Sequence, residues 1–230
     1  MNTTKIPDFS AILEKNYVTY RRFWLDFMLS AFAHEMRGVV FDLGGKRDNK
    51  RGTFISPENQ VHTWQYVNLD MSTHPNIFAD VTRVPVLSQS VDSIVCTEVL
   101  EHLPNPQACV DEIHRLLRKD GLVFASTPFF YPVHADPYDF QRFTEDGLRH
   151  LFRDFKSVEV YRMGGYAGVL GLIVELGIQG LSEDRFVSRI FRWIMKWFSR
   201  LLFRYDLSIF GRENEVWSKF TTGYFIHAVR

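Results

Sequence analysis

Two neighbouring stretches decide the fold: SVDSIVCTEVLEHLPNP at residues 90–106 and EIHRLLRKDGLVFASTPF at residues 112–129. The first stretch starts with an apolar run that predicts a buried strand. Residues 106–118 then place apolar side chains at helical spacing, with Pro106 at the first position and Gly121 just past the end. A second buried strand follows. This order of strand, helix and strand is typical of a parallel sheet.

The same alternation continues on both sides of these stretches. Helices are predicted at residues 9–36, from apolar spacings of three and four, and at residues 144–152, from a Thr-x-x-Gly entry. We therefore expect an α/β chain whose parallel sheet is covered by helices on both faces. The remaining strands are predicted at VVFDLGG (39–45), WQYVNLD (64–70), NIFADV (76–81), FKSVEVYRM (155–163) and TTGYFIHAVR (221–230).

Charge and cysteine content exclude several classes of protein. Lys+Arg and Asp+Glu both number 27 in 230 residues, whereas a nucleic-acid binder would normally carry a basic surplus. Cys96 and Cys109 lie in apolar stretches without zinc-type spacing, so we expect buried thiols and no disulfide. Charged residues interrupt the start of the chain, which predicts no secretory signal and a location inside the cell.

Acidic residues and glycines follow the predicted strands, at the edge where open parallel sheets bind ligands. After Asp42, Gly44 and Gly45 would let the backbone approach a ligand closely. The carboxylate of Asp70 suits a ribose diol, and that of Asp80 suits an adenine amino group. For each aspartate, the alternative to binding a ligand is an exposed turn residue. The motif G-x-G-x-x-G is absent, so these features alone do not choose between cofactors.

EVLEHL, with the helix and strand that follow it, resembles the class I S-adenosylmethionine-dependent methyltransferase superfamily, and the resemblance covers about residues 38–160. It implies a Rossmann-like, mostly parallel seven-stranded sheet with helices on both faces, an N-terminal helix, and a helical insertion before the last strand. It also implies S-adenosylmethionine as the cofactor. The implied contacts are the cofactor loop at Asp42, Gly44 and Gly45, the ribose at Asp70, the adenine at Asp80 and Val81, and the methionine part at Thr97 and Glu98.

The glycine loop departs from the family pattern D-x-G-x-G-x-G. The chain reads DLGGKRD, with Lys46 and Asp48 where later glycines are expected. Two readings stay open: the loop takes another path, or affinity for the cofactor has been lost. His102, in the same family segment, is predicted to be structural or adjacent to the cofactor.

No internal repeat or linker interrupts the chain, so we expect a single methyltransferase domain. Its predicted parts are an N-terminal helix (1–37), a cofactor-binding core (38–163), a helical insertion (164–220) and a last strand (221–230).

A second resemblance lies in FFYPVHADPYDFQRFTEDGLRHLF, residues 129–152, which is similar to a segment of methyltransferases associated with bacterial surface-polysaccharide clusters. It implies a loop that overhangs the methyl-transfer position, with His134 as the base. The alternatives are that His134 only pins the loop, and that Arg142 pairs with Asp136 or Asp139. H-A-D-P-Y-D matches no established ligand pattern, so no metal is predicted. The residues predicted to bind the acceptor are Asp136, Tyr138 and Arg142.

A predicted helix over residues 185–204 carries a basic stripe within an arc of roughly 120°. Its other residues are mostly aromatic and aliphatic, which is typical of an interfacial helix on an anionic membrane. The alternative is packing on the sheet or on a second copy in a homodimer. Residues 163–181 are apolar but contain Glu175, and are not predicted to span a membrane. The stripe consists of Arg185, Arg189, Arg192, Lys196, Arg200 and Arg204.

The sequence therefore predicts an enzyme that transfers a methyl group to a small-molecule or glycan acceptor. The polysaccharide resemblance extends this to a lipid-linked sugar of cell-envelope assembly, by analogy alone. The alternative is a catalytically silent protein of the same fold that acts as a membrane-associated partner. No nucleic-acid partner is expected, and the predicted location is cytoplasmic, at the inner membrane face if the basic helix binds lipid.

Overall fold

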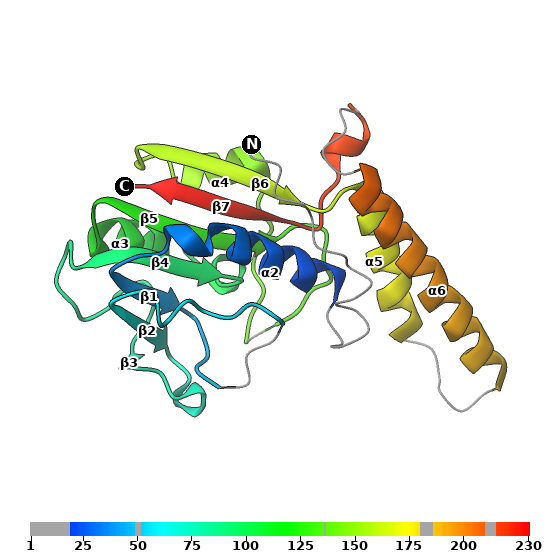
Figure 1. The fold of residues 1–230 in the computed structure, drawn as a ribbon, viewed down its shortest axis with the longest axis horizontal. Helices are drawn as coiled ribbons and strands as arrows, with labels where there is room; N and C mark the ends of the chain where they lie inside the picture. The colour runs from blue at the N-terminus through cyan, green and yellow to red at the C-terminus, as the bar shows by residue number, and fades with distance from the viewer. Residues whose placement is uncertain (1–18, 49–51, 136, 180–185, 210–214) are drawn as a thin grey trace.

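The computed structural model describes residues 19–48, 52–135, 137–179, 186–209 and 215–230. One sheet runs through the molecule, with helices on either side of it (Figure 1). Its strands are β1 (Val39–Leu43), β2 (Thr63–Asn68), β3 (Ile77–Phe78), β4 (Val91–Thr97), β5 (Leu117–Pro128), β6 (Ser157–Met163) and β7 (Gly223–Val229). The helices are α2 (Tyr20–Phe32), α3 (Pro106–Leu116), α4 (Glu145–Leu151), α5 (Tyr166–Gln179) and α6 (Phe186–Ile209). Short 3-10 helices are η1 (Ala33–Glu35), η2 (Met71–Thr73), η3 (Leu100–His102) and η4 (Trp217–Lys219).

The strands lie in the order β3-β2-β1-β4-β5-β7-β6. The last strand, β7, is antiparallel to both β5 and β6, and all other neighbours are parallel. This confirms the predicted Rossmann-like, mostly parallel seven-stranded sheet. The chain adds β2 and β3 on one side of β1 and then places β4 on the other side. Ligands of such sheets bind at the carboxyl ends of the strands beside this switch point.

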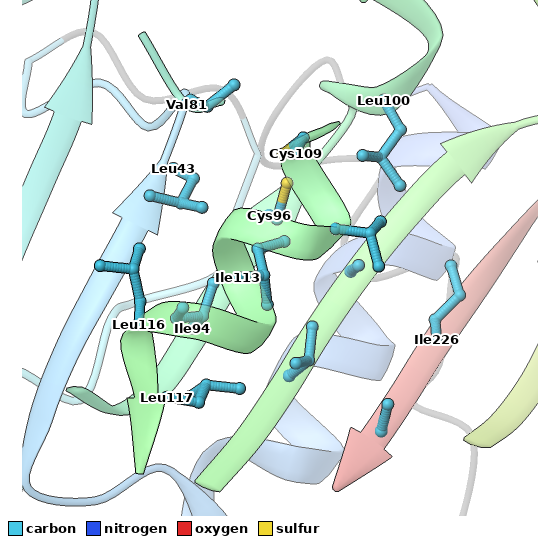
Figure 2. Packing of buried hydrophobic residues seen from close by; sticks show 14 of the residues in the cluster. Leu43, Val81, Ile94, Cys96, Leu100, Cys109, Ile113, Leu116, Leu117 and Ile226 are labelled. Atoms are coloured by element: carbon cyan, nitrogen blue, oxygen red, sulfur yellow. The ribbon is translucent and has the colours of Figure 1, made fainter. Parts of the chain in front are cut away.

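One face of the sheet is covered by α3 and α4, whose apolar side chains form a core with β1, β4 and β5. Figure 2 shows this packing, with Cys96 from β4 beside Cys109 from α3. Both cysteines are buried free thiols, as predicted. The helix predicted to reach residue 118 ends at Leu116, because Leu117 already pairs with Val91 in the sheet.

The opposite face of the sheet is covered by α2, which buries Tyr20, Phe23 and Trp24 against β1, β2 and β5. Thr19 caps this helix, since its hydroxyl accepts a hydrogen bond from the backbone N–H of Arg22. The structure confirms the N-terminal helix from Tyr20 onward, and the first part of the predicted range 9–36 lies outside the described residues.

Helices α5 and α6 stand beside the β6–β7 edge of the sheet as a pair (Figure 1). They occupy the predicted insertion before the last strand. Their base is joined to α2 by Tyr20, whose hydroxyl donates to the buried carboxylate of Asp206 at 2.5 Å and whose ring stacks on Phe203 at 4.2 Å. The backbone N–H of Gly165 donates to the same carboxylate at 2.8 Å. A Cβ on Gly168 would lie 2.4 Å from the Tyr20 ring, so glycine permits this close contact.

Tyr20→Phe is expected to destabilise the protein by about 1–3 kcal/mol, because it leaves the buried Asp206 carboxylate short of a hydrogen bond. Urea unfolding followed by circular dichroism measures the change. Tyr205→Phe is the matched control, since Tyr205 is on the same helix as Asp206 but exposed. Equal midpoints for the two variants would show that the Tyr20–Asp206 hydrogen bond contributes nothing to stability.

Candidate functional site

The residues predicted to hold the cofactor gather at one edge of the sheet. Asp42 lies near the carboxyl end of β1, Asp70 follows β2, Asp80 follows β3, and Thr97 ends β4. Because β1 to β4 are all parallel, these four positions share one edge. The structure thus brings together residues that are up to 55 positions apart in the chain, from Asp42 to Thr97.

Two glycines shape the loop after β1. Gly44 has a φ of +76°, and a Cβ there would lie 2.5 Å from the side chain of Val99. A Cβ on Gly45 would lie 2.3 Å from the carboxyl carbon of Asp42. The side-chain amide of Asn68 donates to the carbonyls of both glycines, at 3.0 and 3.1 Å. Only glycine therefore suits the two positions, and Asn68 is a supporting residue that the sequence reading missed.

Asp70 and Asp80 each close a tight turn through one carboxylate oxygen. The Oδ1 of Asp70 accepts from the backbone N–H of Ser72 at 2.9 Å, and hydrogen bonding to Ser72 lowers the pKa of Asp70. The Oδ1 of Asp80 accepts from the N–H and the hydroxyl of Thr82, both at 2.8 Å. Both aspartates are therefore turn residues, which was the alternative to a cofactor contact. Both carboxylates are exposed, and a carboxylate offers about four lone-pair sites, so each can still accept hydrogen bonds from a ligand.

Exposed apolar side chains flank Asp70 in the chain and are also present on the neighbouring strand β3. Leu69, Met71 and Phe78 are all exposed, although residues of this kind are usually buried. An exposed carboxylate between apolar side chains fits a nucleoside, whose sugar offers hydroxyl groups and whose base offers a flat apolar face. The nucleoside of S-adenosylmethionine matches this chemistry.

Glu98 lies directly after β4, as predicted, but its carboxylate is already paired. It forms an ion pair with Arg21 of α2 and accepts from the hydroxyl of Ser126 at 2.7 Å. Its backbone has a φ of +58°, which is unusual for a residue other than glycine. The guanidinium of Arg21 also lies 4.5 Å from the centre of the Tyr131 ring, and burial lowers the pKa of Arg21 to about 10. Helix α2 therefore supplies a side chain to the site.

The loop after β5 holds the predicted acceptor residues. Arg142 forms a two-pronged ion pair with Asp139, with Nη2 to Oδ2 at 2.7 Å, and also donates to the carbonyl of Pro132. The structure thus shows the alternative in which Arg142 pairs with an aspartate. To bind the acceptor, the Arg142 guanidinium would have to give up Asp139. Tyr138 is exposed, and Asp136 lies outside the described residues.

His134, which lies on this loop, is close to Glu101 and His102 of η3. The Nε2 of His134 is 3.9 Å from a carboxylate oxygen of Glu101, and the Nε2 of His102 is 3.7 Å from it. Glu101 is fully buried, and burial raises its pKa. Burial also lowers the pKa of His134. We call Glu101, His102 and His134 the polar triad.

Sequence reading missed Glu101 and Arg21. Glu101 is part of the quoted EVLEHL segment, but nothing in the sequence shows that its side chain turns away from solvent. Arg21 is one of two consecutive arginines in a helix predicted far from the strand ends. The prediction of no metal considered spacing within one segment, whereas the polar triad combines two segments that folding brings together.

Comparison with solved structures identifies the fold. A S-adenosylmethionine-dependent methyltransferase from Archaeoglobus fulgidus aligns with 97% of this chain and 100% of its own, with a TM-score of 0.55 and 13% identity. The chain has the class I methyltransferase fold. The methyltransferase domain family model also matches residues 56–125, which include β2 to β4 and most of β5.

Curated methyltransferases match parts of this sequence. The ubiquinone biosynthesis O-methyltransferase of Glaesserella parasuis is 48% identical over 40 residues, which cover 17% of each chain. The enzyme of the same name from Nitrosomonas europaea is 28% identical over 99 residues, which cover 40% of each chain. The chain thus spans less than half the length of either relative, and the matches support a shared methyltransferase core.

Proposed function

We propose that this protein transfers a methyl group from S-adenosylmethionine to a hydroxyl oxygen of a small-molecule or glycan acceptor. The observation that carries the proposal is the row of Asp42, Gly44, Gly45 and Asp70 at one sheet edge, with the loop of His134 beside it. The two O-methyltransferase relatives support oxygen as the acceptor atom. The polysaccharide resemblance of residues 129–152 supports a lipid-linked sugar of cell-envelope assembly as the acceptor.

When bound, S-adenosylmethionine supplies a methyl group activated on a sulfonium, so the protein has to position the acceptor and remove its proton. His134 is suited to take that proton. Its Nδ1 lies 3.3 Å from both the Pro132 carbonyl and the Asp139 carboxylate. Since these oxygens only accept, Nδ1 carries the ring proton of the neutral imidazole and Nε2 keeps a lone pair.

We further propose that α6 holds the enzyme on an anionic membrane, where a lipid-linked acceptor would be found. The helix packs on α5 through a narrow stripe that buries Ser199, Phe203 and Asp206. Opposite this stripe, its large apolar side chains are between 41% and 70% exposed. They are Ile190, Phe191, Trp193, Ile194, Trp197, Phe198, Leu201 and Tyr205.

The basic residues of α6 lie along one side of this exposed apolar face. At about 100° per residue, Arg189, Lys196 and Arg200 fall between the buried and the apolar faces. Arg192 is half-buried on the side that packs on α5, and Arg204 lies at the margin of the apolar face. An apolar face flanked by cations is the arrangement of a helix that lies in a membrane interface. No helix in the described part of the chain is long and apolar enough to cross a bilayer. The described cations are Arg189, Arg192, Lys196, Arg200 and Arg204; Arg185 lies outside the described residues.

Asp70→Ala is expected to weaken S-adenosylmethionine binding by roughly 10-fold to 100-fold, because it removes hydrogen bonds between a charged group and the ribose. Isothermal titration calorimetry measures the dissociation constant. Asp154→Ala is the matched control, since Asp154 is an exposed aspartate in the turn between α4 and β6.

Tight binding by the native protein would exclude the catalytically silent alternative in which affinity was lost with the later loop glycines. Absence of binding by the native protein would overturn the proposed methyl transfer. Equal affinities for Asp70→Ala and the control would remove Asp70 from the site.

A further inference from the structure

Glu101 is a buried carboxylate without a hydrogen bond. Its exposed fraction is 0%, and among the described residues no donor reaches either of its side-chain oxygens. Burying an ionised carboxylate is costly unless a cation or several donors compensate it. Among the described residues, the Glu101 carboxylate therefore has no direct hydrogen-bonding partner, although it is buried.

The two histidines of the polar triad present lone pairs to Glu101. The Nδ1 of His102 lies 2.5 Å from the carbonyl oxygen of Tyr138, so it carries the ring proton. The Nδ1 of His134 faces the Pro132 carbonyl and Asp139 in the same way. Both Nε2 atoms are then acceptors, and they stand beside a third acceptor on Glu101. Metal-bound histidines are held in this manner, with the far nitrogen donating to a carbonyl or a carboxylate.

The cations near the polar triad each form an ion pair with another carboxylate. Arg21 pairs with Glu98, and Arg142 pairs with Asp139. Both arginines also act electrostatically on Glu101, but neither donates a hydrogen bond to its carboxylate. A cation between Glu101 and the two imidazoles would be a direct partner for that carboxylate.

We propose that Glu101, His102 and His134 bind one divalent metal ion of the zinc type. One carboxylate and two imidazoles form a ligand set of catalytic zinc sites. Their ligand atoms lie within 4.8 Å of one another. Ligands at about 2.0–2.2 Å from a tetrahedral ion are roughly 3.4 Å apart, so the three atoms would have to move closer together by up to about 1.4 Å. The site goes beyond the proposed methyl transfer, which needs no metal.

The partial exposure of His102 and His134 leaves one side of the polar triad open. A fourth coordination position on that side would take water or an oxygen of the acceptor. This consequence rests on the proposed function: a hydroxyl bound to the ion loses its proton more readily than a free one. In the metal-bound protein, His134 would act as a ligand, and coordination would replace its role as the base.

The test uses the full, untagged chain, stripped with a chelator and dialysed. ZnCl2 is titrated by calorimetry, and CoCl2 is titrated in parallel because tetrahedral cobalt absorbs strongly in the visible range. We expect one equivalent to bind. Glu101→Gln and His134→Ala should each weaken binding on the order of 100-fold or more, since even an indirect supporting group contributes 10–100-fold. His150→Ala is the control, because that side chain is exposed and outside the polar triad.

S-adenosylmethionine affinity is measured on the same samples. Retained affinity in Glu101→Gln shows that this variant is folded, and the weaker zinc binding then supports the site. If Glu101→Gln fails to fold, His134→Ala on its exposed loop carries the comparison. No stoichiometric binding by the native chain, or binding that both variants keep, would overturn the metal site. If the native chain does not bind S-adenosylmethionine, that result would count against the proposed function and not against the metal site.

Discussion

Replacing His134 with alanine is expected to lower the rate of methyl transfer by ~10²–10⁴-fold while leaving S-adenosylmethionine binding unchanged. His134 lies on the loop after β5, whereas Asp70 follows β2 and the glycine loop follows β1. The alanine variant lacks the imidazole that takes the proton of the acceptor hydroxyl, but it keeps the proposed cofactor contacts. Single-turnover transfer of a labelled methyl group, with an acceptor found by screening hydroxylated envelope precursors, measures the effect.

His134→Asn separates chemistry from loop positioning. Its amide N–H can still donate to the Pro132 carbonyl or to Asp139, but it has no imidazole lone pair. We expect this variant to be as slow as His134→Ala. If His134→Asn transfers methyl groups at the native rate, or if the rate of His134→Ala is within threefold of the native rate, then His134 only holds the loop in place. His150→Ala should transfer methyl groups at the native rate.

Reversing three charges on α6 is expected to abolish membrane binding. In the native protein the exposed apolar face would enter the acyl boundary while the cations meet anionic headgroups. Each cation near such a surface contributes roughly 1 kcal/mol, and the attraction fades within a Debye length. Replacing Arg189, Arg192 and Lys196 with glutamate removes this attraction and adds repulsion, without touching the strand ends.

Vesicle flotation at two salt concentrations tests this expectation. The native protein should float with vesicles containing phosphatidylglycerol at low salt, less at high salt, and poorly with neutral phosphatidylcholine vesicles. The triple variant should stay at the bottom of the gradient and still bind S-adenosylmethionine. If the exposed face is instead a dimer interface, the native protein will ignore vesicles and sediment as a dimer, and Trp193→Asp will split it.

The fold was predictable because each element is encoded locally. Apolar runs closed by Asp42 or Asp70 mark strands, and Pro106 marks the start of α3. The family resemblance implied a mostly parallel sheet without saying which strand is antiparallel, and the structure shows that this strand is β7. Helix ends were less accurate, since pairing of Leu117 with Val91 overrides the helical pattern there.

The candidate site was predictable only where it follows the strands. Glu101, Arg21 and Asn68 act through tertiary contacts that no spacing reports. Glu101 is followed directly by a histidine of the polar triad, yet its burial depends on η3 and on the loop that carries His134. For α6, the sequence showed the basic stripe but could not show which of the remaining sides packs on α5.

Tyr20 and Arg21 are consecutive residues that join two distant parts of the enzyme. Tyr20 holds Asp206 at the base of the α5–α6 pair, and Arg21 holds Glu98 beside the strand ends. A single peptide bond therefore separates the anchor of α6 from the ion pair at the candidate active site. If α6 lies on a membrane as proposed, α2 would connect the surface-bound helix pair to the candidate active site through two consecutive residues.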